Sequence, residues 1–408
     1  MLAHEISLDV GGTFTDFFVK NLDNTFDVYK SLTTPHDISQ GIFNGLEMIA
    51  ERRKLALKEL IGGLASLSCG TTVATNAILE KKVAKTALIC TDGFRDTLLI
   101  REGGKENTYD LNVDYPEPYI PRRLTFPVRE RINAEGGVER ALDEAQVREI
   151  ISTLKAWGVE AIAVSLLWAI TNPAHELRIG EIIAEEWPEV PFSLGHQVNP
   201  TIREYRRTSA TAIDASLKPV IQQKLSQLQN RLTNSGFRGV LTLVISSGGR
   251  TSLEEVLRQP VQLCLSGPSA ISQAGMLMAR HIGNTQGNVV TVDMGGTSFD
   301  VAITTNWMTP LHRVGKIGDD VFGVPSVEVL TVGAGGGSLA RVDSGGFIHV
   351  GPESAGSSPG PACYGRGGER PTVTDANLVV GFLDPDDFGD GQMRLSIAAS
   401  HQAVRAHV

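Results

Sequence analysis

Two short stretches of the chain repeat one pattern, in which an apolar run leads into a glycine turn and a second apolar run follows. Apolar residues dominate Ile6 to Val10 and Phe17 to Val19 around the first turn. They dominate again from Val289 to Met294 and from Val301 to Thr304 around the second. Short apolar runs bounded by turn residues are typical of buried strands. Each stretch therefore predicts a tight turn between two buried strands.

The rest of the chain alternates between helical and strand patterns. Helices are predicted where apolar residues recur at helical spacing, and strands where short apolar runs stand between turn residues. The predicted helices cover 38–55, capped by Asp37 or Ser39, and 72–79, 143–157, 173–187 and 203–232, the last interrupted at Pro219. Further strands are predicted at 25–30, 67–70, 86–90, 161–167 and 241–245.

The length of the chain predicts more than one domain. A chain of 408 residues exceeds what a single hydrophobic core usually fills. We expect one domain at 1–197, with an irregular insertion at about 101–140, and a second at 198–408. Because strand, turn and strand begin an α/β alternation in each half, the pattern predicts a duplicated α/β architecture with a cleft between the halves.

The two turns have matching chemistry. Asp9-Val-Gly-Gly-Thr-Phe-Thr-Asp16 and Asp293-Met-Gly-Gly-Thr-Ser-Phe-Asp300 share Asp, Gly, Gly, Thr and Asp at the same offsets, 284 residues apart. Paired glycines allow backbone N–H groups to approach an anion, threonine adds a hydroxyl donor, and aspartate can hold hydrated Mg²⁺. One copy alone would be typical of an ordinary hairpin turn. Two matched copies favour a pair of phosphate-binding turns.

Composition narrows the possible functions. The net charge of −9 gives no basic face, so we expect no nucleic-acid partner. The four cysteines lack metal-ligand spacing and are expected to be buried and reduced. No signal peptide or membrane-length apolar run is evident, which predicts a cytoplasmic protein without a membrane partner. The absence of a Gly-Xaa-Ser-Xaa-Gly elbow disfavours a serine hydrolase.

Further motifs lie along most of the chain. The most specific block lies at 332–338, 354–368 and 374–377. The other motifs lie at 9–16, 70–76, 130–132, 203–209, 266–268 and 293–300. In these motifs the chain resembles the hydantoinase/oxoprolinase family, which includes N-methylhydantoinase A subunits, 5-oxoprolinase and the nucleotide-binding subunits of acetone and acetophenone carboxylases. The resemblance implies the fold shared by actin, hexokinases and heat-shock chaperone ATPases, with duplicated ATPase domains and a nucleotide cleft between them.

Two features depart from the family pattern. Ile100-Arg101-Glu102-Gly103 stands where members usually carry a Gly-Arg-Gln-type segment, in a region associated with substrate selection. The identity of the substrate is therefore not implied. The sequence ends at Val408, whereas members continue with a further glycine-rich element that would contact adenosine. We therefore expect the sequence to be truncated at its C-terminus, with an incomplete adenine pocket.

The turn chemistry and the resemblance together define the predicted site. Asp9 and Asp293 end their strands and are predicted to hold Mg²⁺ through water. Asp16 and Asp300 are the other two predicted catalytic residues, and they would orient a nucleophile or the metal shell. Alternatively, each could have the purely structural role of capping its turn. The phosphates are predicted to be held by Gly11, Gly12, Thr13 and Thr15 on one side and by Gly295, Gly296, Thr297 and Ser298 on the other.

Three more segments are predicted to contact the nucleotide. The first follows a strand and opens a helix, where its N–H groups and hydroxyls would meet an anion or serve as an ordinary N-cap. The second is a short Ser-Gly-Pro motif. The third is a glycine-rich run that would otherwise belong to the domain interface. Their residues are Thr71, Thr72 and Asn76; Ser266, Gly267 and Pro268; and Gly335, Gly336 and Gly337.

The resemblance implies an ATP-dependent enzyme. A ring amide is stabilised by resonance, and phosphorylating its carbonyl oxygen creates a group that water can displace. The implied function is that of a nucleotide-binding subunit or domain of a cyclic-amide hydrolase of the hydantoinase or 5-oxoprolinase type. ATP and Mg²⁺ are its expected cofactors, a small cyclic amide its substrate and a companion B-type subunit its partner in a hetero-oligomer.

Three alternatives stay open. A ketone carboxylase subunit, acting on a ketone plus bicarbonate, would use the same phosphate-binding turns. A non-catalytic ATP switch or scaffold would close around nucleotide, as actin and chaperone ATPases do. A truncated chain would be inert if its nucleotide pocket were incomplete. ATP turnover that depends on a small cyclic amide separates the amide hydrolase from the switch.

Overall fold

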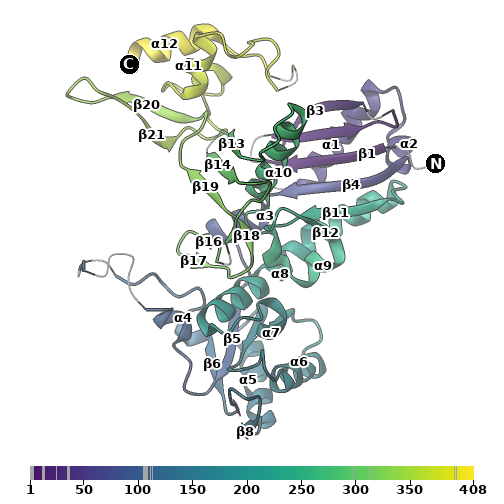
Figure 1. Cartoon of the computed structure of the whole chain (residues 1–408), viewed down its shortest axis with the longest axis vertical. Helices are drawn as coiled ribbons and strands as arrows, with labels where there is room; N and C mark the ends of the chain where they lie inside the picture. The colour runs from purple at the N-terminus through teal and green to yellow at the C-terminus, as the bar shows by residue number, and fades with distance from the viewer. Residues whose placement is uncertain are drawn as a thin grey trace.

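The computed structural model contains three larger sheets, and the long helix α8 (Glu204–Asn234) lies between two of them (Figure 1). The structure describes residues 4–11, 14–23, 25–34, 37–103, 109–110, 112, 114–296, 298–312, 314–389, 391 and 393–408. Helices and strands alternate along most of the chain, which confirms the predicted α/β class.

The central sheet has six strands in the order β12-β11-β4-β1-β2-β3. Its inner face, with Ile6, Leu8 and Val10, packs in one core with α1 (Ile38–Arg52), α8 and α2 (Leu57–Gly62). Its outer face carries Ser7 and Asp9, whose side chains remain accessible and line a cavity. The strands are β1 (His4–Val10), β2 (Phe14–Lys20), β3 (Phe26–Leu32), β4 (Leu64–Thr71), β11 (Val240–Val244) and β12 (Arg250–Ser252).

A second, all-parallel sheet forms the lobe at the bottom of Figure 1, in the order β10-β9-β5-β6. Its strands β5 and β9 are buried throughout, as parallel strands covered on both faces usually are. Three short strands fall inside the described part of 101–140, a segment predicted to be irregular, and one of them, β6, belongs to this sheet. Pro127 and the shortness of β6 hide its pattern in the sequence. The strands are β5 (Thr86–Thr91), β6 (Thr125–Val128), β9 (Ala161–Ser165) and β10 (Phe192–Leu194), and the helices α4 (Thr97–Ile100), α5 (Glu144–Ala156), α6 (Ala174–Glu186) and α7 (Gly195–Val198).

Helix α8 contributes to both of these cores. Ile213 and Leu217 pack in the core of the central sheet, and Tyr205 and Ala212 pack in the core of the lower lobe. The prediction that the helix breaks at Pro219 is wrong, because α8 continues through it. Burial of the helix on several sides offsets the hydrogen bond that proline cannot make.

The third sheet has the order β13-β14-β19 and packs against helix α10 (Ser266–His281). Its strands are β13 (Val289–Met294), β14 (Phe299–Thr304) and β19 (Val329–Val332). The prediction that β13 is buried is wrong: Val290 is 67% and Val292 56% exposed. These side chains alternate with Thr291, which faces Gly275 of α10, and so they lie on the opposite, uncovered face.

The C-terminal part is organised around one buried carboxylate, Asp375. It caps α11 (Val373–Val379) by accepting hydrogen bonds from the backbone N–H and hydroxyl of Thr372. It also accepts from the N–H of Cys363, at 2.8 Å, and from Ser400 Oγ on α12 (Ile397–His407), at 2.7 Å. One side chain therefore joins two segments of the family-specific block, 354–368 and 374–377, to the last helix. The third segment is joined by Thr374, whose N–H and hydroxyl donate to Gly336 O at 2.7 and 2.8 Å. The strands β20 (Ser338–Val342) and β21 (Ile348–Ser354) form a hairpin nearby.

The remaining elements are short connections. They are α3 (Val73–Leu79), α9 (Leu253–Arg258), β7 (Arg131–Ile132), β8 (Val138–Arg140), β15 (Leu311–His312), β16 (Lys316–Ile317), β17 (Asp320–Val321) and β18 (Ser326–Val327), with 3-10 turns at Arg122–Leu124, Pro260–Leu263 and Ala362–Tyr364. The central sheet takes strands from both sides of the predicted boundary at 197–198, so the two predicted domains share a sheet. The division into 1–197 and 198–408 stays a prediction.

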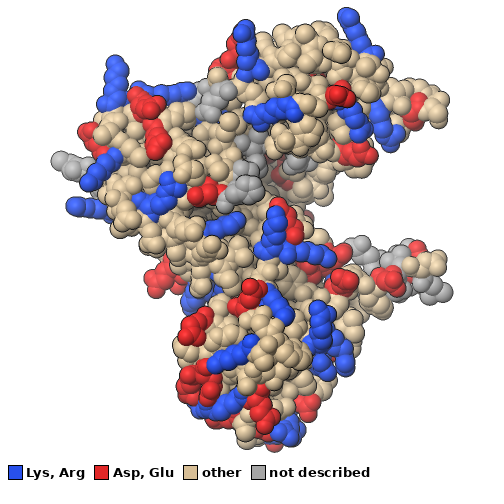
Figure 2. Space-filling view, turned by 180° about the vertical axis from the view of Figure 1, so that it is seen from behind, with Lys and Arg blue, Asp and Glu red and all other residues tan. Residues whose placement is uncertain are grey.

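The surface and the cysteines complete the description. All four cysteines are buried and free, as predicted. On the face shown in Figure 2, Lys and Arg are interspersed with Asp and Glu rather than gathered in a basic patch. Among the described residues, no helix combines the length and the apolar character needed to cross a membrane.

Replacing Asp375 with Asn should lower the free energy of unfolding by about 3 kcal/mol, because the new amide group would face backbone donors. Burial raises the pKa of Asp375, but hydrogen bonds from Ser400, Thr372 and Cys363 outweigh it and leave the pKa lowered. The carboxylate's contribution is thus fully present above the unfolded pKa and is lost as the pH falls through the folded one. Urea denaturation across acidic pH measures both effects.

The control for this prediction is the exposed Asp387→Asn, which should leave stability within about 0.5 kcal/mol of the parent chain. Equal stability of Asp375→Asn and the parent chain would contradict the role assigned to Asp375.

Candidate functional site

The two glycine turns are built in the same register. In the first, Asp9 lies opposite Asp16 across the β1–β2 pair, and Gly11 N donates to Phe14 O at 3.0 Å. In the second, Asp293 lies opposite Asp300 across the β13–β14 pair, and Gly295 N donates to Ser298 O at 2.9 Å. The paired residues and the turn hydrogen bond of the second hairpin are therefore those of the first hairpin shifted by 284 residues. Both predicted hairpins are confirmed as matched structures.

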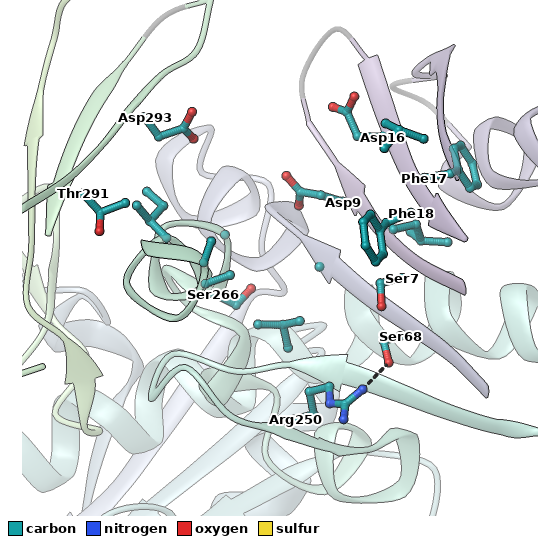
Figure 3. A pocket seen from close by; sticks show the side chains of 18 of the residues that line it. Ser7, Asp9, Asp16, Phe17, Phe18, Ser68, Arg250, Ser266, Thr291 and Asp293 are labelled. Atoms are coloured by element: carbon teal, nitrogen blue, oxygen red, sulfur yellow. Dashed lines mark hydrogen bonds between the residues drawn. The ribbon is translucent and has the colours of Figure 1, made fainter. Parts of the chain in front are cut away.

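A cavity of about 590 Å³, called here the hairpin cleft, lies between the outer face of the central sheet and the wall made by α10 and β13. It brings together Asp9, Asp16 and Asp293 from the two hairpins and Ser266 and Gly267 from the start of α10. Figure 3 shows Asp293 and Asp9 on opposite walls, with Ser266 between them. Five predicted site residues thus line one cavity.

Asp9 is placed by its neighbour on the next strand. It pairs with Gly70 of β4, and a Cβ on Gly70 would lie 2.9 Å from Asp9 Oδ1. Glycine at this position therefore makes room for the carboxylate. The walls of the cleft displace bulk water, and this desolvation raises the pKa of Asp9; the negative charges of Asp16 and Asp293 raise it further, while Lys30 opposes them.

The other two cleft carboxylates have different environments. Desolvation raises the pKa of Asp293, and the charges of Asp300 and Asp16 raise it further. Asp16 instead forms an ion pair with Lys30 Nζ on β3, at 2.7 Å. Asp9 and Asp293 are thus the two carboxylates of the cleft that would gain most from a bound cation.

The predicted glycine run 335–337 supports the second hairpin. Gly336 N donates to Gly295 O at 2.9 Å, and Gly337 N donates to Gly296 O at 2.7 Å. Gly335 N donates to Ser338 Oγ at 2.8 Å. All three N–H groups have partners within the protein, and those of Gly336 and Gly337 brace the second hairpin turn. Their contact with nucleotide stays a prediction.

The start of α10 is fixed against the strand-turn segment that follows β4. Ser266 Oγ donates to Thr71 O at 3.1 Å, and Leu265 N donates to Thr75 Oγ1 at 2.9 Å. Leu265 itself has φ of 55°, a left-handed conformation that is unfavourable for leucine. These contacts direct the first turn of a 16-residue helix into the cleft, where its N-terminal dipole favours an anion.

Several predicted residues lie elsewhere. Thr15 is fully buried and hydrogen-bonds to Thr33 across the sheet. Asp300 is buried and accepts hydrogen bonds from Ser298 Oγ and Thr331 Oγ1, an arrangement that suits the turn-holding role left open above. Pro268 continues α10 without lining the cleft. The predicted site residues Gly12, Thr13 and Thr297 lie outside the described residues.

The last predicted group lines a different cavity, of about 550 Å³, called here the second cavity. It contains Gly11 and the predicted nucleotide contacts Thr71, Thr72 and Asn76. Thr72 is the N-cap of α3 but makes no side-chain capping bond; its Oγ1 accepts from Asn76 Nδ2 at 3.2 Å. The structure thus separates the predicted residues into two cavities.

Sequence reasoning missed Arg250, which is the one basic side chain among the described residues of the hairpin cleft. It donates from Nη1 to Ser68 Oγ at 3.0 Å, across β12, β11 and β4. No local motif surrounds Arg250 in the sequence. Only the strand order, which brings residue 250 beside residue 68, reveals it.

The acidic residues of the cleft fit a magnesium ion held in part by a ligand. Among the described residues, no group of three or more His, Cys, Asp or Glu side chains could hold a metal by itself. Magnesium commonly binds through one or two carboxylates, several waters and the phosphates of a substrate. Asp9 and Asp293 would supply the two carboxylates of such a site.

Two family models match the chain. The model for the Hydantoinase/oxoprolinase N-terminal region matches residues 5–187, and the Hydantoinase/oxoprolinase model matches residues 207–407. The chain belongs to the hydantoinase/oxoprolinase family. Asp375 joins two segments of the family-specific block recognised in the sequence, 354–368 and 374–377.

Known members of the family match nearly the whole chain. Caprolactamase subunit alpha of Pseudomonas jessenii is 38% identical over 407 residues, which is 99% of this chain and 58% of that protein. Acetophenone carboxylase gamma subunit of Aromatoleum aromaticum is 38% identical over 422 residues, or 99% and 57%. The crystal structure of the ATP-dependent caprolactamase of P. jessenii has a TM-score of 0.84 at 38% identity, over 98% of this chain and 58% of that one. The chain thus shares their α/β fold and spans less than two thirds of their length.

The segment that departs from the family pattern lies beside the start of α8. Glu102 accepts hydrogen bonds from Arg206 Nε and Nη2, both at 2.8 Å. Arg101 Nη1 donates to Asp319 O at 2.9 Å. In this family member, the segment therefore joins the lower lobe to α8 and to the loop before β17.

Replacing Asp9 with Asn should raise the melting temperature of the ligand-free chain. The raised pKa means that the folded state binds a proton more readily than the unfolded state. The charge therefore costs stability above the folded pKa, and the cost disappears as the pH falls through it. The melting temperatures of the two chains should differ at neutral pH and converge in acid.

Differential scanning calorimetry from neutral to acidic pH tests this expectation, with Asp387→Asn as the control for a carboxylate outside the cleft. A lower melting temperature for Asp9→Asn at neutral pH would mean that the carboxylate stabilises the fold and is not held ready for a cation.

Proposed function

We propose that the chain is the nucleotide-binding part of an ATP-dependent cyclic-amide hydrolase, of the hydantoinase or 5-oxoprolinase type. The observation that carries the proposal is the pair of matched hairpins whose strand-end carboxylates, Asp9 and Asp293, face one cleft. The 38% identity to caprolactamase subunit alpha, together with the ATP dependence of that enzyme, supports it.

In this proposal the two hairpins are the phosphate-binding elements of a duplicated actin- and hexokinase-like fold, and the nucleotide lies between them. The N–H groups of Gly11 and Gly295 close their own turns, so Gly296 and the first turn of α10 would meet the phosphate oxygens. Gly296 faces open space, since a Cβ there would meet nothing within 4 Å. Arg250, at the other end of the cleft, would offer a cation to the rest of the nucleotide.

Asp9 and Asp293 would hold Mg²⁺ through its water ligands. When bound, the ion would neutralise charge on the phosphates and draw the two hairpins toward one centre. The raised pKa of each carboxylate supports this role, because repulsion between the two walls is relieved by a cation. Asp16, which is paired with Lys30, is left to orient water or the second reactant.

The chemistry of this reaction depends mainly on position. The carbonyl oxygen of the amide attacks the γ-phosphorus, a new P–O bond forms, and the bond to the leaving ADP breaks. Water then adds to the activated carbon, and the ring C–N bond breaks as the leaving amine takes up a proton, which leaves an acyl phosphate. A second water hydrolyses the acyl phosphate to a carboxylate and inorganic phosphate. The protein would contribute alignment, charge neutralisation and exclusion of bulk water. A companion subunit in a hetero-oligomer is proposed for the hydrolytic steps, since the named relatives are subunits.

A ketone carboxylase subunit is a second candidate, because the acetophenone carboxylase gamma subunit is equally similar at 38% identity. The carboxylase subunit would use the same pair of hairpins to bind ATP and activate a ketone and bicarbonate.

A nucleotide switch or scaffold is a third candidate function. It predicts slow ATP hydrolysis that no small substrate accelerates.

We expect the chain to bind Mg-ATP in a manner that requires Asp293. The Asp293→Asn variant should bind about 50-fold more weakly, which corresponds to about 2.3 kcal/mol. Isothermal titration calorimetry with the parent chain, this variant and the control Asp387→Asn measures the difference. Equal affinities for the parent chain and Asp293→Asn would refute the proposal that the two hairpins bind Mg-ATP together.

The same proteins, with the companion subunit present, are then assayed for ATP turnover with hydantoin, 5-oxoproline, or acetone plus bicarbonate. Stimulation by a cyclic amide supports the hydrolase, whereas stimulation by the ketone supports the carboxylase. Turnover that none of these compounds accelerates, with Mg-ATP bound, would favour the switch.

A further inference from the structure

The second cavity adjoins the hairpin cleft at the ends of two strands. Along β1, Asp9 lines the cleft and Gly11 lines the second cavity; along β4, Gly70 lines the cleft and Thr71 the second cavity. The two cavities therefore lie on either side of the first hairpin. A molecule held in the second cavity would lie within reach of a phosphate held at the Gly11 turn.

The wall near the hairpin is rich in hydroxyl and amide groups. Thr72 Oγ1 already accepts a hydrogen bond from Asn76 Nδ2, so its own hydrogen is available to a ligand. Asn76 retains a second amide hydrogen, and Thr34 also lines this space. Such donors suit the carbonyl oxygen of an amide.

An apolar surface lies beside these donors. It is formed by residues at the starts of α1 and α3 and from the middle of α8, and it suits the methylene carbons of a small ring. Its residues are Ile38, Val73, Ala77 and Val220.

The second cavity also carries an excess of positive charge. Lys82 Nζ is paired with Glu80 Oε2 at 2.7 Å, and both are exposed. Lys224, a half-buried residue of α8, also lines the cavity and lowers the pKa of Glu80 from a distance, after the larger effect of Lys82. The cavity is thus lined by two ammonium groups and one carboxylate, and that carboxylate is paired with Lys82. Among the described residues, no acidic group forms an ion pair with Lys224 within 4.0 Å.

We propose that the second cavity binds the amide substrate, and that this substrate is a cyclic amide bearing a carboxylate. Thr72 and Asn76 would meet the carbonyl oxygen beside the hairpin, and Lys224 would meet the carboxylate. The apolar surface would cover the ring. This inference rests on the proposed function, since it places the second reactant of the same phosphoryl transfer.

Two lactams that differ only in the carboxylate test the proposal. 5-Oxoproline is 2-pyrrolidinone with a carboxylate attached to the ring. We expect 5-oxoproline to bind the full chain about tenfold more tightly than 2-pyrrolidinone, and the Lys224→Met variant to lose this preference. Calorimetry with and without the non-hydrolysable analogue Mg-AMPPNP measures both ligands, and Lys58→Met, on the exposed surface of α2, is the control.

Protection of the lysine amine gives a second readout that needs no variant. 5-Oxoproline should slow the acetylation of Lys224, measured by mass spectrometry, while leaving Lys58 unchanged. 2-Pyrrolidinone at the same concentration should protect Lys224 less.

Three results would overturn the proposal. One is equal affinity for the two lactams, and another is failure of both to bind. The third is a loss of Mg-AMPPNP affinity in Lys224→Met, which would assign the second cavity to nucleotide phosphates. Failure of the parent chain to bind Mg-AMPPNP would instead count against the proposal that the two hairpins bind nucleotide. Lactam binding measured without nucleotide would still test the substrate site.

Discussion

The cost of holding carboxylates in one cleft, first through desolvation and then through mutual repulsion, is the constraint on which the rest of this structure depends. The fold brings Asp9, Asp16 and Asp293 to one cleft, where loss of water and mutual repulsion raise the pKa of both strand-end groups. Such an arrangement lowers the stability of the ligand-free protein. A cation and phosphate oxygens would relieve this repulsion, which supports the proposal that the cleft binds a nucleotide.

The elements around the cleft keep this unfavourable arrangement in place. The central sheet positions Asp9 over Gly70, where no side chain obstructs the carboxylate. The glycine run 335–337 fastens the second turn through hydrogen bonds, and the strained Leu265 directs α10 toward the first. Helix α8 packs into two cores, so that the lower lobe and the central sheet share one helix.

The sequence predicted local features well because they depend on nearby residues. Both hairpins, the Asp37 cap of α1 and most helices follow from short patterns. Long-range features were missed: Arg250 reaches the cleft only through strand order, and β6 is too short to be recognised. The continuity of α8 through Pro219 likewise depends on packing that no local pattern contains. The division of the site into two cavities also required the fold.

A double-mutant cycle on Mg-ATP affinity tests the central claim most directly. Dissociation constants are measured for the parent chain, Asp9→Asn, Asp293→Asn and the double variant. If both carboxylates serve one ion, the double variant should bind hardly more weakly than the weaker single variant, giving a large coupling energy. The account would be contradicted if the losses in binding free energy of the two single variants summed to that of the double variant within about 0.5 kcal/mol. The two hairpins would then act independently.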